Sequence, residues 1–158
     1  MDEQAERQAD RASETEAGYL PPATQWVRDQ LTVIDATGDT GSVDIQGRPV
    51  VVLTMLGRRS GAMRRVPLMR VEHHGVYAAV ASKGGAPDHP DWYFNLMADP
   101  WVELHDGTAH IQTRARLVQG PEREQWWPRC VDAFPSYADY QDGTDREIPV
   151  FLLEPVAP

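Results

Sequence analysis

The stretch that decides the fold is PVVVLTMLGRRSGAMRRVPLMRV, residues 49–71. Its two ends, within 49–56 and 65–72, are rich in aliphatic and β-branched residues, which predicts two strands. Gly57 and Gly61 interrupt the apolar pattern between them, so the strands are expected to form a hairpin. The tip and shoulder of this hairpin carry four arginines, which we call the arginine cluster: Arg58, Arg59, Arg64 and Arg65.

The arginine cluster contrasts with the charge of the whole chain. The 158 residues include 15 Lys and Arg against 24 Asp and Glu, a formal net charge of -9 at pH 7. Arginine presents a planar fork of N–H donors that matches phosphate and carboxylate oxygens. We therefore expect the cluster to bind a multiply charged anion, with a solvated charged loop as the competing interpretation.

Length and composition indicate one soluble domain with a hydrophobic core. Apolar residues make up 41% of the chain and charged residues 25%, a balance typical of globular domains. Residues 1–18 are polar, which predicts a mobile tail ahead of a single folded domain over 19–158. Because the sequence lacks a signal peptide and a membrane-spanning run, a cytoplasmic location is expected, with peripheral contact at the inner face of the membrane as the alternative.

Apolar patterns and turn signals predict the other elements. Helices are expected from Trp26 to about Gly38, over 90–98 with Asp88 as the cap, and from Pro121 to Val131. Further strands are expected over 76–81, 102–104, 109–117 and 148–153. The alternation of Ile111, Thr113, Ala115 and Leu117 places these residues on one strand face. Short antiparallel strands with few helices favour an α+β fold, a small and partly open β-barrel.

A second cationic loop, Ala81-Ser82-Lys83-Gly84-Gly85, follows the strand over 76–81. We call residues 81–87 the glycine loop. Its glycines allow close approach of a ligand to the backbone, its successive amides can hold an anion, and Lys83 adds a positive charge. Because the strands before the two cationic loops are expected to be neighbours in the sheet, we predict that both loops contribute to one anion site.

Two aromatic groups supply candidate contacts for a planar ring. Trp92, Tyr93 and Asn95 open the short helix over 90–98 and offer an apolar wall with an amide. Tyr137 and Tyr140 are three residues apart and share one face of a helical turn. Their hydroxyls can orient a carbonyl or nitro oxygen and donate a proton, whereas core packing is the competing interpretation.

Signatures of other chemistries are missing from the sequence. The single cysteine, Cys130, is expected to be a small core residue on a helix. The five histidines have no metal-ligand spacing, and His105 and His110, which flank a turn, are expected to be exposed. The sequence lacks a G-x-S-x-G elbow and a G-x-G-x-x-G fingerprint. The acidic net charge argues against nucleic acid as a partner.

Together these motifs resemble the deazaflavin-dependent nitroreductase family of actinobacterial oxidoreductases. The resemblance runs in order from about residue 24 to the C-terminus. It implies a split β-barrel and binding of coenzyme F420, a deazaflavin joined through ribitol and a phosphate to a lactyl-oligoglutamate tail. The segments that carry it are 57–61 with Arg64, 66–68, 81–85 with Pro90, 92–93 with Asn95, 99–100, 135–141, 144–146 and 148–149.

The resemblance also implies roles for single residues. The phosphate and tail would be held by Arg58, Arg59, Ser60 and Arg64. The ribitol and ring would be bordered by Pro67, Leu68, Met69, Ala81, Ser82 and Lys83. The coenzyme site would be closed by Trp92, Tyr93 and Asn95. The catalytic residues would be Tyr137 near the ring, with Tyr140 and Ser82 facing the substrate.

The implied activity is an oxidoreductase that uses reduced coenzyme F420 to transfer a hydride to a small electron-poor conjugated acceptor. Enones, quinones and nitro compounds belong to this class. Phe134 stands where some members of the family have a tyrosine, and this argues against efficient reduction of nitroimidazoles. The alternatives are a non-catalytic deazaflavin carrier and an FMN- or haem-binding protein of the same fold.

Overall fold

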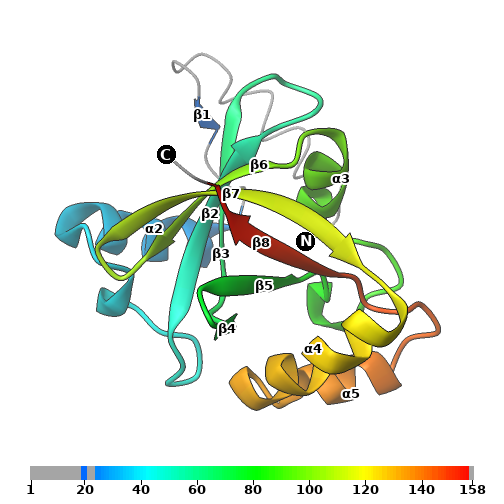
Figure 1. Ribbon diagram of the computed structural model, residues 1–158. Coiled ribbons are helices and arrows are strands. Elements are labelled where there is room, and N and C mark those ends of the chain that lie inside the picture. Colours follow the sequence, from blue (N-terminus) through cyan, green and yellow to red (C-terminus); the bar gives the residue numbers. More distant parts are fainter. Residues whose placement is uncertain (1–18, 21–23, 157–158) are drawn as a thin grey trace.

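The computed structural model describes residues 19–20 and 24–156, so the predicted tail over 1–18 lies outside the described residues. In this part of the chain, eight strands form one curled sheet in the order β1-β3-β2-β6-β7-β8-β5-β4 (Figure 1). All strand pairs are antiparallel except β1 with β3. The strands are β1 (Tyr19–Leu20), β2 (Val50–Leu56), β3 (Met63–Met69), β4 (Glu72–His73), β5 (Val76–Val80), β6 (Trp101–Asp106), β7 (Ala109–Val118) and β8 (Val150–Pro155).

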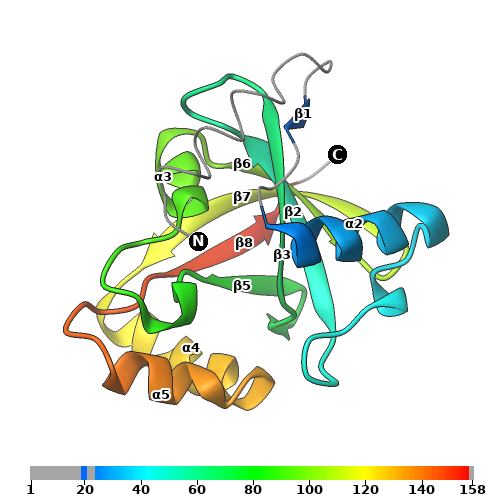
Figure 2. The ribbon, with the colours of Figure 1, turned by 180° about the vertical axis from the view of Figure 1, so that it is seen from behind.

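Helices lie around this sheet on several sides. In both ribbon views, α4 and α5 lie side by side below β5, whereas α2 lies beside β2 and β3 (Figures 1 and 2). Two short 3-10 turns, η1 (Thr40–Ser42) and η2 (Lys83–Gly85), join the elements. The α-helices of the described residues are α2 (Gln25–Thr37), α3 (Asp91–Ala98), α4 (Gly120–Ala133) and α5 (Ser136–Asp142).

The strand predicted over 65–72 is divided in the structure, and this division closes the barrel. Its first part, β3, pairs with β2, whereas its continuation, β4, pairs with β5. The amide of Ala78 also donates to the carbonyl of Val71, at 2.9 Å. One bent segment therefore joins both ends of the curled sheet, which gives the predicted split β-barrel.

The predicted adjacency of the strands before the two cationic loops is wrong. β5 hydrogen-bonds to β8 and β4, and not to β2 or β3. The two loops nevertheless lie toward the same end of the barrel, because β4 continues β3 and β5 runs back antiparallel to β4. The bend after β3, which the pattern of apolar residues does not mark, accounts for the difference.

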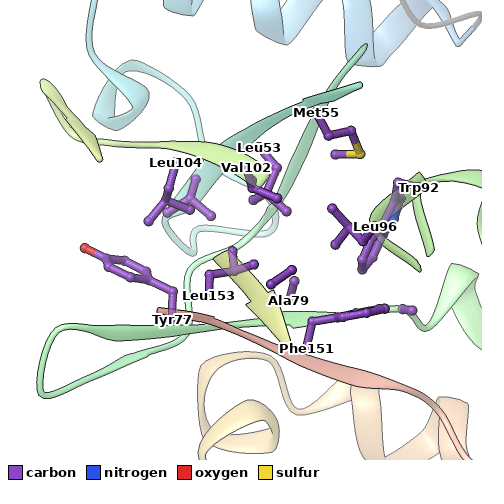
Figure 3. Packing of buried hydrophobic residues seen from close by; sticks show 13 residues of the cluster. Leu53, Met55, Tyr77, Ala79, Trp92, Leu96, Val102, Leu104, Phe151 and Leu153 are labelled. Carbon is purple, nitrogen blue, oxygen red and sulfur yellow. The ribbon is translucent and has the colours of Figure 1, made fainter. Parts of the chain in front are cut away.

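Three hydrophobic clusters lie against the sheet, and the smallest, Leu31, Ile34 and Val52, joins α2 to β2. The first fills the curl of the sheet, where Leu53, Leu104 and Leu153 are fully buried and Trp92 and Leu96 enter from α3 (Figure 3). The second lies between the opposite face and the helices α4 and α5. Alternate residues of β5 and β8 belong to alternate clusters, as the period of two in a strand requires. On β7, Ile111, Ala115 and Leu117 pack against the first cluster, as predicted.

Two local predictions are wrong. Asp88 does not cap α3, because Pro90 is the N-terminal flanking residue and no side chain makes a cap hydrogen bond there. His105 is buried, not exposed, since its Nε2 lies 3.1 Å from the carbonyl oxygen of Gly38 at the end of α2. By contrast His110 is exposed as predicted. Cys130 is fully buried on α4, as predicted, and burial raises the pKa of its thiol to about 12.

Candidate functional site

The loop between β2 and β3 is a tight turn that needs its glycines. Gly61 has a φ of +71°, a conformation that residues with a Cβ rarely adopt. A Cβ at Gly57 would lie 3.0 Å from the carbonyl oxygen of Ala62. The hydroxyl of Ser60 accepts a hydrogen bond from the amide of Ala62, at 3.1 Å. These contacts shape the backbone that carries Arg58 and Arg59.

Arg58 connects this loop to α3. Its backbone amide and its Nη1 donate to Oδ1 of Asn95, at 3.1 and 2.9 Å. Nη1 also donates to the carbonyl oxygen of Asp91, at 3.1 Å. The guanidinium lies over the ring of Phe94, 5.0 Å from its centroid. Two residues predicted to contact a ligand, Arg58 and Asn95, therefore contact each other and join two elements of the fold.

The other members of the arginine cluster differ in their surroundings. Arg65 makes two hydrogen bonds to the carboxylate of Asp35 on α2, at 2.7 and 2.9 Å. Hydrogen bonding from Arg65 holds the pKa of Asp35 below its usual value. Arg64 is half-buried on β3, and Arg59 is exposed at the tip of the loop. The cluster thus includes one exposed cation and at least two cations engaged within the fold.

The glycine loop has an unusual backbone. Ser82 has right-handed helical angles, whereas Lys83, Gly84 and Gly85 follow with φ of 47°, 63° and 83°. When a residue with right-handed backbone angles is followed by one with left-handed angles, their successive N–H groups point to the same side, and this favours binding of an anion there. Lys83 is exposed, and a Cβ at Gly84 would meet no atom within 4 Å. Both observations fit an anionic ligand beside this loop.

The glycine loop packs directly on α5. A Cβ at Gly85 would lie 3.1 Å from the carbonyl oxygen of Tyr140 and 3.2 Å from its Cα. Tyr140 is half-buried. Tyr137 is only 4% exposed, its ring packs edge-on against Phe134, and burial raises the pKa of its phenol. Both predicted tyrosines therefore pack at the second cluster, but Tyr137 is buried in it, whereas Tyr140 is half-buried and has its backbone beside Gly85.

Arg146 is a residue of this site whose role the sequence reasoning missed. Its guanidinium donates to the carbonyl oxygens of Ala81, Ser82 and Ala86, at 3.1, 2.7 and 2.8 Å. Nη1 also donates to Nδ1 of His89, at 2.9 Å. The sequence offered one signal for Arg146: it lies in the segment 144–146, one of those that carry the family resemblance.

A continuous set of contacts joins Arg58 and α3 to the glycine loop. Arg58 contacts α3, where the ring of Tyr93 stacks against His89 with 4.1 Å between centroids. His89 contacts Arg146, and Arg146 contacts the glycine loop. Other predicted residues are less accessible: Pro67, Met69, Ala81, Ser82 and Trp92 are buried, and Leu68 is half-buried.

The residues that the structure describes contain no group of three His, Cys, Asp or Glu side chains arranged for a metal ion. None of their helices is long and apolar enough to cross a membrane. The polar groups of the two cationic loops are arginine, lysine, backbone amides and hydroxyls, which suit phosphate and carboxylate oxygens.

The described residues thus form a split β-barrel with two cationic loops toward one end and an aromatic helix that contacts both through Arg58, His89 and Arg146. The family model of F420H(2)-dependent quinone reductase matches residues 26–155, and the chain belongs to this family. The protein is therefore a reductase that uses reduced coenzyme F420. The predicted family, fold, enzyme class and cofactor are confirmed.

Individual relatives agree with this assignment. F420H(2)-dependent quinone reductase Rv1261c of Mycobacterium tuberculosis is 34% identical over 108 residues, which cover 66% of this chain and 72% of the relative. The solved F420-H2 dependent reductase FDR-A is 53% identical, with a TM-score of 0.65 over 71% of this chain and 99% of that chain. A solved chain described as a domain-swapped dimer is 52% identical, with a TM-score of 0.67 over 82% of this chain and 97% of that chain.

Proposed function

We propose that the arginine cluster and the glycine loop together hold coenzyme F420 for the reduction of quinones. The observation that carries this proposal is the continuous set of contacts from Arg58 through α3, His89 and Arg146 to the glycine loop. These contacts support a single site, with the arginine cluster on one side of α3 and Lys83 of the glycine loop on the other. FMN has a phosphate but no polycarboxylate tail, so a site with separated cations favours the deazaflavin coenzyme.

The donors of the two cationic loops divide between the parts of the coenzyme. Arg59, Arg64 and Lys83 bind the phosphate and the carboxylates, together with the amides of the glycine loop. Arg58 and Asn95 hold the loop between β2 and β3 in place for that contact. Leu68 and Tyr93, which are half-buried, border the ring. The buried residues Pro67, Met69, Ala81 and Trp92 support these contacts from behind.

The bound reduced deazaflavin supplies a hydride, and reduction of a quinone to a hydroquinone requires one proton in addition. Tyr140 is the candidate donor of this proton, because its side chain is more exposed than that of Tyr137 and its backbone lies beside Gly85 of the glycine loop. Tyr137 packs behind it and keeps its own proton, since burial raises its pKa. Ser82 orients the acceptor. The largest contribution of the protein is the fixed relative orientation of donor and acceptor.

Enones and nitro compounds are further candidate acceptors, because they share the electron-poor conjugated system of a quinone. Phe134 is 5% exposed and packs against Tyr137, so it supplies no hydroxyl to a nitro group. Quinones are therefore expected to be reduced faster than nitroimidazoles.

The test is a fluorescence titration with oxidised coenzyme F420, with FMN in parallel. The unsubstituted protein is expected to bind F420 with a Kd in the low micromolar range or tighter, about -8 kcal/mol. Arg59→Ala should weaken binding about tenfold, because it removes a charge-assisted hydrogen bond. Arg65→Ala is the matched control, since Arg65 binds Asp35, and it should leave the affinity close to that of the unsubstituted protein.

A preference for FMN, or equal affinity in the Arg59→Ala and unsubstituted proteins, would contradict the proposed coenzyme site. If the protein binds F420, a turnover assay separates a reductase from a non-catalytic deazaflavin carrier. The protein supplied with reduced F420 and a short-chain quinone should oxidise the coenzyme in repeated cycles, whereas a carrier would bind it without turnover.

A further inference from the structure

Arg146 is surrounded by neutral acceptors. Four hydrogen bonds lead from its guanidinium to three carbonyl oxygens of the glycine loop and to His89. Among the described residues it forms no ion pair with a carboxylate, in contrast to Arg65, Arg70 and Arg116. A half-buried guanidinium that uses nearly all its donors on backbone carbonyls organises the backbone around it.

We propose that Arg146 is a positioning residue that holds the glycine loop in the conformation that receives the coenzyme. This inference rests on the function proposed above. The carbonyls of Ser82 and Ala86 flank the left-handed residues Lys83, Gly84 and Gly85, and Arg146 bonds to both carbonyls. One side chain therefore joins the two ends of the strained segment.

The benefit of this arrangement is preorganisation. Fixing each residue of a flexible loop costs conformational entropy. Arg146 holds three residues with left-handed backbone angles before the ligand binds, so this entropy cost does not reduce the affinity. The amides of Gly85 and Ala86, which donate to Ser82 and Lys83 at 2.9 and 3.1 Å, report whether the loop keeps its shape.

The geometry requires arginine and not lysine. Arginine has five donors in a planar fork, whereas lysine has three donors on one nitrogen. The acceptors of Arg146 lie at both ends of the loop and on His89, so a single ammonium does not replace the fork. A lysine at position 146 would retain the charge and lose the geometry, which separates these two contributions.

The contact with His89 extends this role to α3. Because the guanidinium donates to Nδ1, the imidazole is neutral and carries its proton on Nε2. The ring of His89 then stacks on Tyr93. The backbone of Arg146 is held from α5, because Nε2 of Gln141 donates a hydrogen bond to the carbonyl oxygen of Arg146, at 2.8 Å. Arg146 thus connects α5, the glycine loop and α3, three segments that the proposed function places around the coenzyme and the acceptor.

The experiment compares Arg146→Lys with Arg48→Lys. Arg48 is the matched control, because it also donates to backbone carbonyls, those of Asp132 and Ala133 at the end of α4. Hydrogen exchange of the coenzyme-free protein should show exchange of the Gly85 and Ala86 amides about tenfold faster in Arg146→Lys. The Kd for oxidised coenzyme F420 should rise about tenfold in the same variant. Arg48→Lys should change neither quantity.

Each result has a distinct meaning. Unchanged exchange of the Gly85 and Ala86 amides in Arg146→Lys would overturn the positioning role, even if the affinity for F420 fell, since Arg146 would then act on the coenzyme directly. Faster exchange with unchanged affinity would overturn it as well. Failure of the unsubstituted protein to bind F420 would refute the proposed coenzyme site, while the exchange rates would still decide whether Arg146 holds the loop.

Discussion

The two cationic loops differ in the origin of the contacts that hold them. In the arginine cluster, the cations of the segment itself bind the surrounding fold: Arg58 contacts α3 and Arg65 contacts α2. In the glycine loop, the local cation Lys83 is exposed, and a distant residue, Arg146, holds the backbone. The number of positive charges in a segment therefore does not measure how many of them are available to a ligand.

The largest effect is expected at the contact between the glycine loop and α5. Gly85→Ala should lower the free energy of unfolding by about 2–4 kcal/mol for two reasons. The residue has a φ of +83°, which strains an alanine, and the new Cβ would lie 3.1 and 3.2 Å from backbone atoms of Tyr140. Gly84→Ala is the control, with a φ of +63° and open space, and should lose about 1 kcal/mol. Urea unfolding measures both values. Equal losses would show that α5 does not constrain the loop.

A smaller effect separates the structural arginine of the cluster from the exposed one. Arg58→Ala should lower the free energy of unfolding by about 1–3 kcal/mol, since Asn95, only 6% exposed, loses the guanidinium that donates to its Oδ1. Arg59→Ala should stay within about 0.5 kcal/mol of the unsubstituted protein. The measurement is again urea unfolding. If Arg59→Ala destabilises the fold as much as Arg58→Ala, the proposed division of roles is wrong.

The smallest effect concerns Arg65 and Asp35. The Asp35 side chain is 55% exposed, so Asp35→Asn should cost less than about 1 kcal/mol at pH 7. Because the pKa of Asp35 is lower in the folded state, the pair stabilises the fold above the ordinary aspartate pKa of 3.8, and this contribution is lost as the pH falls below it. Thermal unfolding from pH 7 to pH 3 should show the two proteins converge in Tm. A constant difference across this range would contradict the assignment.

Local signals predicted most of the elements but not how they close into a barrel. Asp106-Gly107 marks the turn between β6 and β7, and Gly38 ends α2 with a φ of 71°. These features depend on a few consecutive residues. Burial of His105 depends instead on the end of α2, which lies 67 residues earlier in the chain. The bend between β3 and β4 depends on pairing with β5.

The same distinction holds for the candidate site. The resemblance identified the two loops and the aromatic residues because their motifs are short and ordered along the chain. It placed Tyr137 near the ring and Tyr140 toward the substrate, but it did not show that Tyr137 is buried in the second cluster while Tyr140 is only half-buried, because the packing of α5 decides this. Likewise it assigned no role to Arg146, whose carbonyl acceptors lie 60 to 65 residues away.

The sequence by itself determined most strands, the glycine turns and the clustered cations, because these are local properties of the chain, and its resemblance to a family identified the split barrel and the kind of ligand. Only the tertiary structure decided which cations are engaged within the fold and which residue holds the glycine loop. The physical reason is that a hydrogen bond depends on the distance and direction between two groups, and folding sets both for residues such as Arg58 with Asn95 and Arg146 with Ser82.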